Sequence, residues 1–242
     1  MVLKQEHIFF LGIGGIGMSA LARYLHMSGH KVSGYDRDKT KLTKKLEASG
    51  IEIQYSFDDT VSRDSIDMVI YTPAIKPDQA EFQYFSRREI EMKKRSEALK
   101  EILSKRKVIA VAGTHGKTST SAVLAHILHY NEFGASAFIG GVLTNYNTNF
   151  LYGETDWVVI EADEYDRSFW RIYADVAIIQ AMDPDHLDIY GTGAEMVKAY
   201  EVFTLQMSDK GRLFVADGAY PKMDADWSVS YTHLTLPTTP YV

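Results

Sequence analysis

A glycine-rich loop between an apolar run and a helical stretch constrains the fold of this chain most. Residues 108–112 are apolar throughout, the loop begins at Gly113, and residues 117–130 have helical character. Such an apolar run is typical of a strand buried on both faces of a parallel sheet. A glycine loop that leads directly into a helix is typical of the first half of a βαβ unit. The segment therefore predicts an α/β fold built on a parallel sheet.

The same loop, Gly113-Thr-His-Gly-Lys-Thr118, has the composition of a phosphate-binding loop. Its glycines allow backbone N–H groups to turn toward phosphate oxygens, and the helix N-terminus adds partial positive charge. The match to the full Walker pattern is imperfect, because Val111 stands where that pattern has glycine. An ordinary strand–turn–helix with an exposed lysine is the alternative. We predict that the ATP-binding residues are Gly113, Thr114, His115, Gly116, Lys117, Thr118 and Ser119.

A second glycine-rich turn, Gly12-Ile-Gly-Gly-Ile-Gly17, follows an apolar run at residues 7–13 and precedes a predicted helix at 18–27. A second predicted strand, residues 31–35, ends just before Asp36. This spacing is that of the dinucleotide-binding fingerprint, in which the turn lets a diphosphate approach the backbone. The pattern does not identify the nucleotide, and a turn that uses glycine only for packing is the alternative.

Two acidic segments follow apolar runs in the second half of the chain. Glu161-Ala-Asp-Glu-Tyr-Asp166 follows residues 157–161, and Asp183-Pro-Asp-His-Leu-Asp-Ile-Tyr190 follows residues 175–180. The carboxyl ends of strands are where open α/β sheets bind ligands. Clustered carboxylates repel one another unless a cation compensates, and Mg²⁺ prefers oxygen ligands. We predict a magnesium site in the first of these segments, with a solvated acidic loop as the alternative. In the second segment, His186 is a candidate to ligate a second metal or to hydrogen-bond a phosphate, with a surface or cap histidine as the alternative.

Composition sets the remaining limits. The net charge of -6 disfavours nucleic acid as a partner, because phosphate backbones need a basic surface. No apolar run approaches the roughly 20 residues of a membrane helix, and the polar start of the chain does not resemble a signal peptide. The chain has no cysteine, which excludes disulfides and thiolate metal sites. The sequence makes no prediction of oligomeric state.

The order of these segments predicts two domains. We predict a Rossmann-like first domain over residues 1–105 and a truncated P-loop α/β domain over residues 106–227. Residues 228–242 contain two prolines and have neither helical nor strand periodicity. We interpret them as a non-native tail, with a natural tail as the alternative.

Taken together, the motifs resemble the Mur ligases of peptidoglycan synthesis, and their order and spacing agree over residues 1–227. In that family the first glycine turn holds the diphosphate of a UDP-sugar rather than NAD. The segment Tyr71-Thr-Pro-Ala-Ile75 resembles the family's sequence around this sugar nucleotide, with Thr72 in place of a more usual serine. The resemblance implies UDP-sugar binding by Gly12, Gly14, Gly15, Gly17, Asp36 and Thr72.

Within the family, the resemblance is strongest to the branch that adds L-alanine to UDP-N-acetylmuramic acid through an acyl phosphate in the cytoplasm. It implies that Lys117 binds the ATP γ-phosphate, that Thr118 and Glu161 bind a first Mg²⁺, and that His186 helps to hold a second. Lys117, Glu161 and His186 are thus the expected catalytic residues. For the second metal, Glu201 and a carbamylated Lys198 both stay open as further ligands.

Members of this family have a longer central domain and a third domain that helps to bind the amino acid. The resemblance therefore implies an amino-terminal fragment that does not complete ligation alone. Two other classes of function stay open, a P-loop kinase or ATPase acting on a small acid and a nucleotide-sugar or dinucleotide-binding module. Within the family, a peptide-recycling muramate ligase is the alternative.

Overall fold

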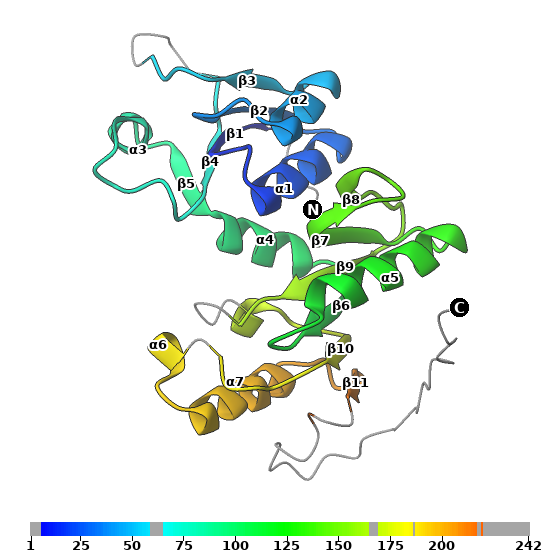
Figure 1. Ribbon diagram of the computed structural model, residues 1–242. Helices are drawn as coiled ribbons and strands as arrows, with labels where there is room; N and C mark the ends of the chain where they lie inside the picture. The colour runs from blue at the N-terminus through cyan, green and yellow to red at the C-terminus, as the bar shows by residue number, and fades with distance from the viewer. Residues whose placement is uncertain (1–5, 59–64, 165–168, 186, 217–218, 220–242) are drawn as a thin grey trace, which may run out of the picture. The chain divides into compact units, whose positions relative to one another are not determined.

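The computed structural model describes residues 6–58, 65–164, 169–185, 187–216 and 219, in which strands and helices alternate (Figure 1). The helices are α1 (Ile16–Met27), α2 (Lys41–Ala48), α3 (Ala80–Ser86), α4 (Arg95–Leu103), α5 (Lys117–Tyr130), α6 (Leu187–Tyr190) and α7 (Gly193–Leu205). The strands are β1 (His7–Leu11), β2 (Lys31–Tyr35), β3 (Glu52–Gln54), β4 (Met68–Tyr71), β5 (Glu91–Lys94), β6 (Lys107–Ala112), β7 (Ser136–Leu143), β8 (Thr148–Leu151), β9 (Trp157–Ala162), β10 (Val176–Ile179) and β11 (Arg212–Val215). The alternation confirms the predicted α/β class.

The chain divides into two compact units. Unit 1 combines residues 1–108 with residues 118–161, and unit 2 combines residues 109–117 with residues 162–242. Each unit therefore takes in two stretches of sequence. The domain limits expected at residues 105 and 227 stay predictions, and the segment 228–242 lies outside the described residues.

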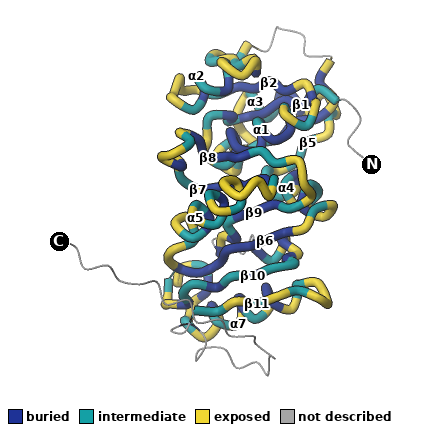
Figure 2. The backbone as a smooth tube through the Cα atoms, turned by 90° about the vertical axis from the view of Figure 1, so that its right-hand side faces the viewer, coloured by how far each residue is buried: buried dark blue, intermediate teal, exposed yellow. Residues whose placement is uncertain are grey.

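Unit 1 contains a parallel sheet with the strand order β3-β2-β1-β4-β5. The central strand β1 pairs with β2 on one side and with β4 on the other, from Ile8, which lies opposite Val32 and Met68. Residues 8–11 of β1 are buried, as Figure 2 shows. This burial explains why the strand is a continuous apolar run rather than an alternating one.

Aromatic side chains fill the core beside this sheet. Phe9 of β1 packs on Phe85 of α3 with ring centroids 5.1 Å apart, and Tyr84 lies against Phe85 at 5.0 Å. Full burial of each such side chain contributes about 1.5–3 kcal/mol. The cluster therefore fixes the short helix α3 to the sheet.

Helix α1 is covered on two sides within unit 1. It packs on β2 and α2, and it also packs on β7 and β8. Tyr24 contacts Phe138 of β7 and Phe150 of β8, with ring centroids 5.5 and 6.1 Å apart. At the start of the helix, the Asn149 side-chain amide donates to the Ile16 carbonyl at 2.6 Å. Cover on both sides explains why residues 18–22 of α1 are all buried.

The second sheet contains the remaining strands among the described residues. In unit 1, β7 pairs in parallel with β9 and antiparallel with β8. In unit 2, β10 pairs in parallel with β6 and with β11. The β7–β8 pair is therefore an antiparallel edge on an otherwise parallel arrangement, a common departure in α/β folds.

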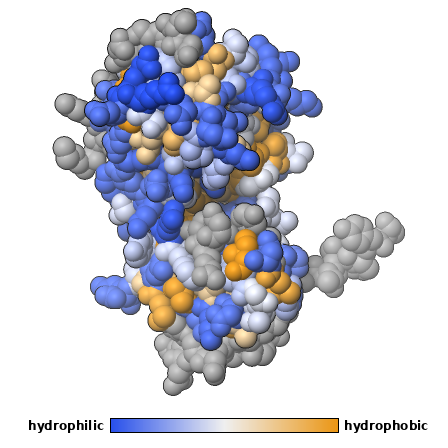
Figure 3. Space-filling view, turned by 90° about the vertical axis from the view of Figure 1, so that its left-hand side faces the viewer, coloured by the Kyte–Doolittle hydropathy of each residue, from blue (hydrophilic) through white to orange (hydrophobic). Residues whose placement is uncertain are grey.

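Hydrophilic residues cover much of the face drawn in Figure 3, where apolar residues form small separate groups. Among the described residues, no helix is long and apolar enough to cross a bilayer.

Candidate functional site

The loop between β6 and α5 has the backbone of a phosphate-binding turn. Gly113 and Gly116 have φ angles of +133° and +80°, which side-chain-bearing residues rarely adopt. A Cβ on Gly113 would lie 2.8 Å from the backbone nitrogen of Ala181. Glycine at position 113 is thus required both by the backbone angle and by the close approach of the chain after β10.

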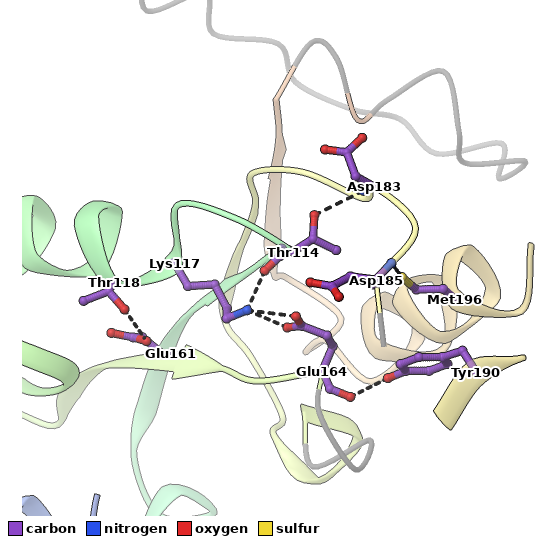
Figure 4. Close-up of polar contacts among 10 residues, drawn as sticks. Thr114, Lys117, Thr118, Glu161, Glu164, Asp183, Asp185, Tyr190 and Met196 are labelled. Atoms are coloured by element: carbon purple, nitrogen blue, oxygen red, sulfur yellow. Dashed lines mark hydrogen bonds and ion pairs between the residues drawn. The ribbon is translucent and has the colours of Figure 1, made fainter. Parts of the chain in front are cut away.

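The Lys117 ammonium lies inside this loop within unit 2. Its Nζ donates to the Gly113 carbonyl at 2.7 Å and to both Glu164 carboxylate oxygens at 2.7 and 2.9 Å (Figure 4). The Lys117 side chain is 17% exposed and the Glu164 side chain 1%. All three ammonium protons are therefore used, and the pair is shielded from water.

Two tyrosines surround Glu164 in unit 2. The Tyr190 hydroxyl donates to the backbone carbonyl of Glu164 and fixes the chain at this point. The Tyr200 ring is fully buried, and burial, reinforced by the negative charge of Glu164, raises the pKa of Tyr200 far above its ordinary value. Tyr200 is consequently a neutral phenol at physiological pH.

Thr114 joins the loop to the segment that follows β10. Its backbone N–H donates to the Ala181 carbonyl at 3.0 Å, and its hydroxyl accepts from the Asp183 amide at 3.1 Å (Figure 4). Thr114 is buried, whereas His115, Gly116 and Ser119 are exposed. Thr114 therefore shapes the loop, and the exposed residues are the ones a ligand reaches directly.

Thr118 and Glu161 meet within unit 1. The Thr118 hydroxyl donates to Glu161 Oε2 at 3.0 Å, and the Gly140 amide of β7 donates to Glu161 Oε1 at 2.7 Å. A hydroxyl and a carboxylate oxygen side by side are donors that suit Mg²⁺, which takes its other ligands from water and nucleotide phosphates. The residues present thus fit the predicted ion.

The ligands predicted for the second metal are not brought together in the described residues. His186 lies outside the described residues. Within the part of the chain that the structure describes, no three His, Asp or Glu side chains gather as a metal cluster. Lys198 is 67% exposed and pairs with Glu195 at 3.2 Å, and Glu201 is half-buried on the same helix α7. The choice between Lys198 and Glu201 stays open.

The first glycine turn, in unit 1, is closed by Asp36 and Thr72. Asp36 Oδ2 accepts from the Gly14 amide at 2.7 Å. A Cβ on Gly12, whose φ is +81°, would lie 2.6 Å from Thr72 Cγ2. Both residues named with this turn in the sequence thus lie directly against it.

Two residues that sequence reasoning did not single out lie at these loops. Glu164 belongs to the acidic run after β9, and that run was the only signal for it. Arg95, the first residue of α4, lies against the other turn, where a Cβ on Gly17 would be 2.9 Å from its Nη1. Among the described residues, no side-chain hydrogen-bond or ion-pair partner is found for the Arg95 guanidinium. Its guanidinium is therefore available to an anion at the start of α1.

Two sequence profiles match the chain, "Mur ligase family, catalytic domain" over residues 7–107 and "Mur ligase middle domain" over residues 111–231. The chain belongs to the Mur ligase family. This Mur ligase chain is 45% identical over 223 residues to the UDP-N-acetylmuramate–L-alanine ligase of Flavobacterium psychrophilum. The match covers 90% of the chain and 50% of that relative, so the chain spans about half the length of the curated relatives it matches.

Solved Mur ligase structures share the fold. The UDP-N-acetylmuramate–alanine ligase of Thermotoga maritima matches with a TM-score of 0.79 and 30% identity, over 90% of this chain and 51% of that one. The UDP-N-acetylmuramate:L-alanyl-γ-D-glutamyl-meso-diaminopimelate ligase of Neisseria meningitides also matches with a TM-score of 0.79, at 26% identity, over 88% of this chain and 72% of that one. The Mur ligase fold is thus supported by structure as well as by sequence.

Proposed function

We propose that the chain carries the ATP- and UDP-sugar-binding parts of a cytoplasmic ligase that adds L-alanine to UDP-N-acetylmuramic acid. Family membership supports a ligase over a kinase or a simple binding module. Eight curated relatives at 41–45% identity are named UDP-N-acetylmuramate–L-alanine ligase, which favours alanine as the amino acid.

One observation carries the assignment of the nucleotide site. The Thr118 hydroxyl, at the start of α5, and the Glu161 carboxylate lie 3.0 Å apart. This pair suits a divalent cation, and the loop residues that precede Thr118 have the backbone of a phosphate cradle. Bound Mg²⁺ would offset the charge of the nucleotide phosphates. The same loop in a purely structural role would not need a carboxylate beside that hydroxyl.

In the proposed reaction, the muramic acid carboxylate attacks the γ-phosphorus of ATP and ADP leaves. The alanine amine then attacks the acyl phosphate and expels inorganic phosphate, with loss of an amine proton. Lys117 and the loop amides stabilise the negative charge that develops on the transferred phosphoryl group. Since Lys117 Nζ already holds three acceptors, at least one of them must yield to the phosphate.

The first glycine turn has a matching role for the UDP-sugar. Its amides and the start of α1 present N–H groups and partial positive charge to a diphosphate. Arg95 adds a full positive charge beside Gly17. Asp36 closes the turn on its other side, where its carboxylate suits the nucleoside hydroxyls.

Calorimetric titration of the purified chain tests this proposal. We expect ATP to bind more tightly with Mg²⁺ than with a chelator, and we expect Thr118→Val to remove that difference. Lys117→Ala should abolish ATP binding, whereas Lys210→Ala, at an exposed lysine with no proposed role, should not change it.

The second titration compares UDP-N-acetylmuramic acid with NAD. Binding of the UDP-sugar alone is expected. Binding of NAD without the UDP-sugar would instead favour a dinucleotide-binding module, and unchanged ATP affinity in Lys117→Ala would remove the nucleotide-site assignment.

A peptide-recycling ligase is the second candidate, because a solved peptide ligase matches the fold with the same TM-score as the alanine ligase. The higher identity of the alanine-adding relatives favours the first candidate. ADP release that depends on the peptide and not on alanine, measured with the whole enzyme, would reverse this preference.

A further inference from the structure

A pocket of about 290 Å³ lies in unit 1, and no residue of either glycine turn lines it. Its walls come from the C-terminal half of α1, from the end of α2 at Ser49, and from β8 with the residues that flank it. Figure 1 shows α1 and β8 as neighbours, and the α1–β8 packing described above confirms it. The volume is at the lower end of the range for small-molecule sites.

Arg23 of α1 supplies the charge of this pocket. Its Nη1 donates to the Thr148 hydroxyl, which in turn donates to the Phe150 carbonyl at 3.0 Å. A guanidinium has five N–H donors, and within the described residues Arg23 has no other hydrogen-bond partner and no carboxylate. Burial lowers the pKa of Arg23, and no neighbouring acid opposes that effect. The half-buried cation is thus left without a counter-charge.

Lys45 strengthens the positive character of the pocket, and His26 adds a polar ring to its wall. His26, one turn along α1, donates from Nε2 to the Ser49 carbonyl at 3.0 Å. Lys45 Nζ donates to Asn147 Oδ1, at the rim, at 2.7 Å. Among the described residues that line the pocket, none is acidic. In a chain with a net charge of -6, this local positive region is distinctive.

The rest of the wall is apolar. Phe150 and Leu151 of β8 are buried, Tyr152 continues the surface, and Met27 is 53% exposed at the rim. Phe150 is held by the ring of Tyr24, which meets it edge-on. A wall of fixed aromatic and aliphatic groups beside one desolvated guanidinium is typical of a site for a molecule with an acidic group and an apolar body.

We propose that this pocket binds a small organic anion, with its carboxylate or phosphate against Arg23 and its apolar body against Phe150, Tyr152 and Met27. The acidic group takes the guanidinium donors that the protein leaves unused, in the planar arrangement that suits bidentate contact. The apolar body excludes water from the charge pair and so strengthens it. None of the residues that line this site belongs to the proposed ATP or UDP-sugar sites.

The test uses NMR spectra of the isotope-labelled chain titrated with benzoate, phenyl phosphate or inorganic phosphate at constant ionic strength. We expect benzoate and phenyl phosphate to shift the backbone amides of residues 146–152. We expect inorganic phosphate, which has no apolar body, to bind at least about tenfold more weakly than phenyl phosphate. Shifts confined to residues 113–119, or equal affinity for the two phosphates, would overturn the proposal.

Two substitutions test the charge and the shape of the pocket one at a time. Arg23→Gln should weaken phenyl phosphate binding about tenfold or more, since it removes the charge-assisted hydrogen bonds. Arg37→Gln, at a side chain that is 85% exposed, is the matched control and should bind as the parent does. Met27→Trp narrows the rim without touching Arg23 and should also weaken binding. If either Arg23→Gln or Met27→Trp binds phenyl phosphate with parental affinity, the proposal fails. If Arg23→Gln does not fold, the affinity of Met27→Trp alone tests the proposal.

Discussion

Glu164→Gln should destabilise unit 2 sharply, because it removes the charge that faces Lys117 in a shielded position. The Lys117 side chain is 17% exposed and that of Glu164 is 1% exposed. Removal of one partner from a buried ion pair typically costs about 3–5 kcal/mol. Glutamine keeps the shape and one acceptor oxygen, so we expect the lower end, about 3 kcal/mol. With urea m-values of about 1–3 kcal/mol/M, the unfolding midpoint should fall by roughly 1–3 M.

The assay follows unit 2 alone. Trp157→Phe and Trp227→Phe leave Trp170 as the only tryptophan, and Trp170 Nε1 donates to the Ala199 carbonyl at 3.0 Å within unit 2. Urea unfolding of this background is followed by fluorescence, with and without Glu164→Gln. The matched control is Glu195→Gln, whose pair with Lys198 is 55% and 67% exposed. Such a surface pair contributes about 0–1 kcal/mol, so its midpoint should barely move.

A double variant completes the cycle. Lys117→Met combined with Glu164→Gln leaves no buried charge, so it should cost clearly less than the sum of the two single changes, with a coupling of about 1–3 kcal/mol. If Glu164→Gln unfolds at the same urea concentration as Glu195→Gln, or if the two changes simply add, the buried pair does not hold the loop as we describe.

Three further predictions concern the glycine turns and the core of unit 1. Gly113→Ala should lower the free energy of unfolding by about 1–3 kcal/mol and weaken ATP binding, because the added Cβ meets Ala181 at 2.8 Å. The control Gly29→Ala, at φ +92° with nothing within 4 Å, should lose only the stability that the strained backbone angle costs. Equal losses of stability in urea unfolding would count against the close contact at Gly113. Arg95→Ala should weaken UDP-N-acetylmuramic acid binding about tenfold in calorimetry, because it removes the positive charge beside Gly17. The control Arg87→Ala, at an exposed arginine, should leave the affinity unchanged. An unchanged affinity in Arg95→Ala would exclude Arg95 from the site. Burial lowers the pKa of His30 below its ordinary value of 6.5, so its contribution to stability should be complete above that pH and lost as the pH falls through the lower folded-state pKa, since the unfolded chain binds the proton more readily. Urea unfolding is followed by Trp157 fluorescence at about pH 7.5 and about pH 5.5, in a background with Trp170→Phe and Trp227→Phe, and measures this loss. His30→Gln should reduce the loss, and the same pH dependence in the variant would assign it to other groups.

Much of the fold was predictable, because buried parallel strands need long apolar runs. The strands β1, β6 and β9 follow directly from such runs, and α5 follows from the loop before it. Strand β5, Glu91-Met-Lys-Lys94, was not predicted, since an edge strand with exposed charged residues has no apolar signal. The β7–β8 pair was also missed, because Gly140 and Gly141 interrupt its apolar pattern.

The candidate site was predictable where local sequence decides it. The positive φ angles of Gly113 and Gly116 follow from the strand–loop–helix pattern, whereas the meeting of Thr118 with Glu161 was expected from the resemblance to the Mur ligases. The partner of Lys117 did not follow, because an acidic run after a strand suggests a metal as readily as an ion pair. Arg95 depends on how α4 approaches α1, and such tertiary placement leaves no local pattern.

The cover that β7 and β8 give to α1 has a consequence for the growing polypeptide on the ribosome. Helix α1 emerges early, but the rings that pack on Tyr24 belong to Phe138 and Phe150 and are synthesised much later. During that interval the nascent helix carries an apolar side that only a chaperone or a transient collapse can shield from aggregation. Unit 1 therefore cannot finish folding co-translationally before β8 has left the exit tunnel.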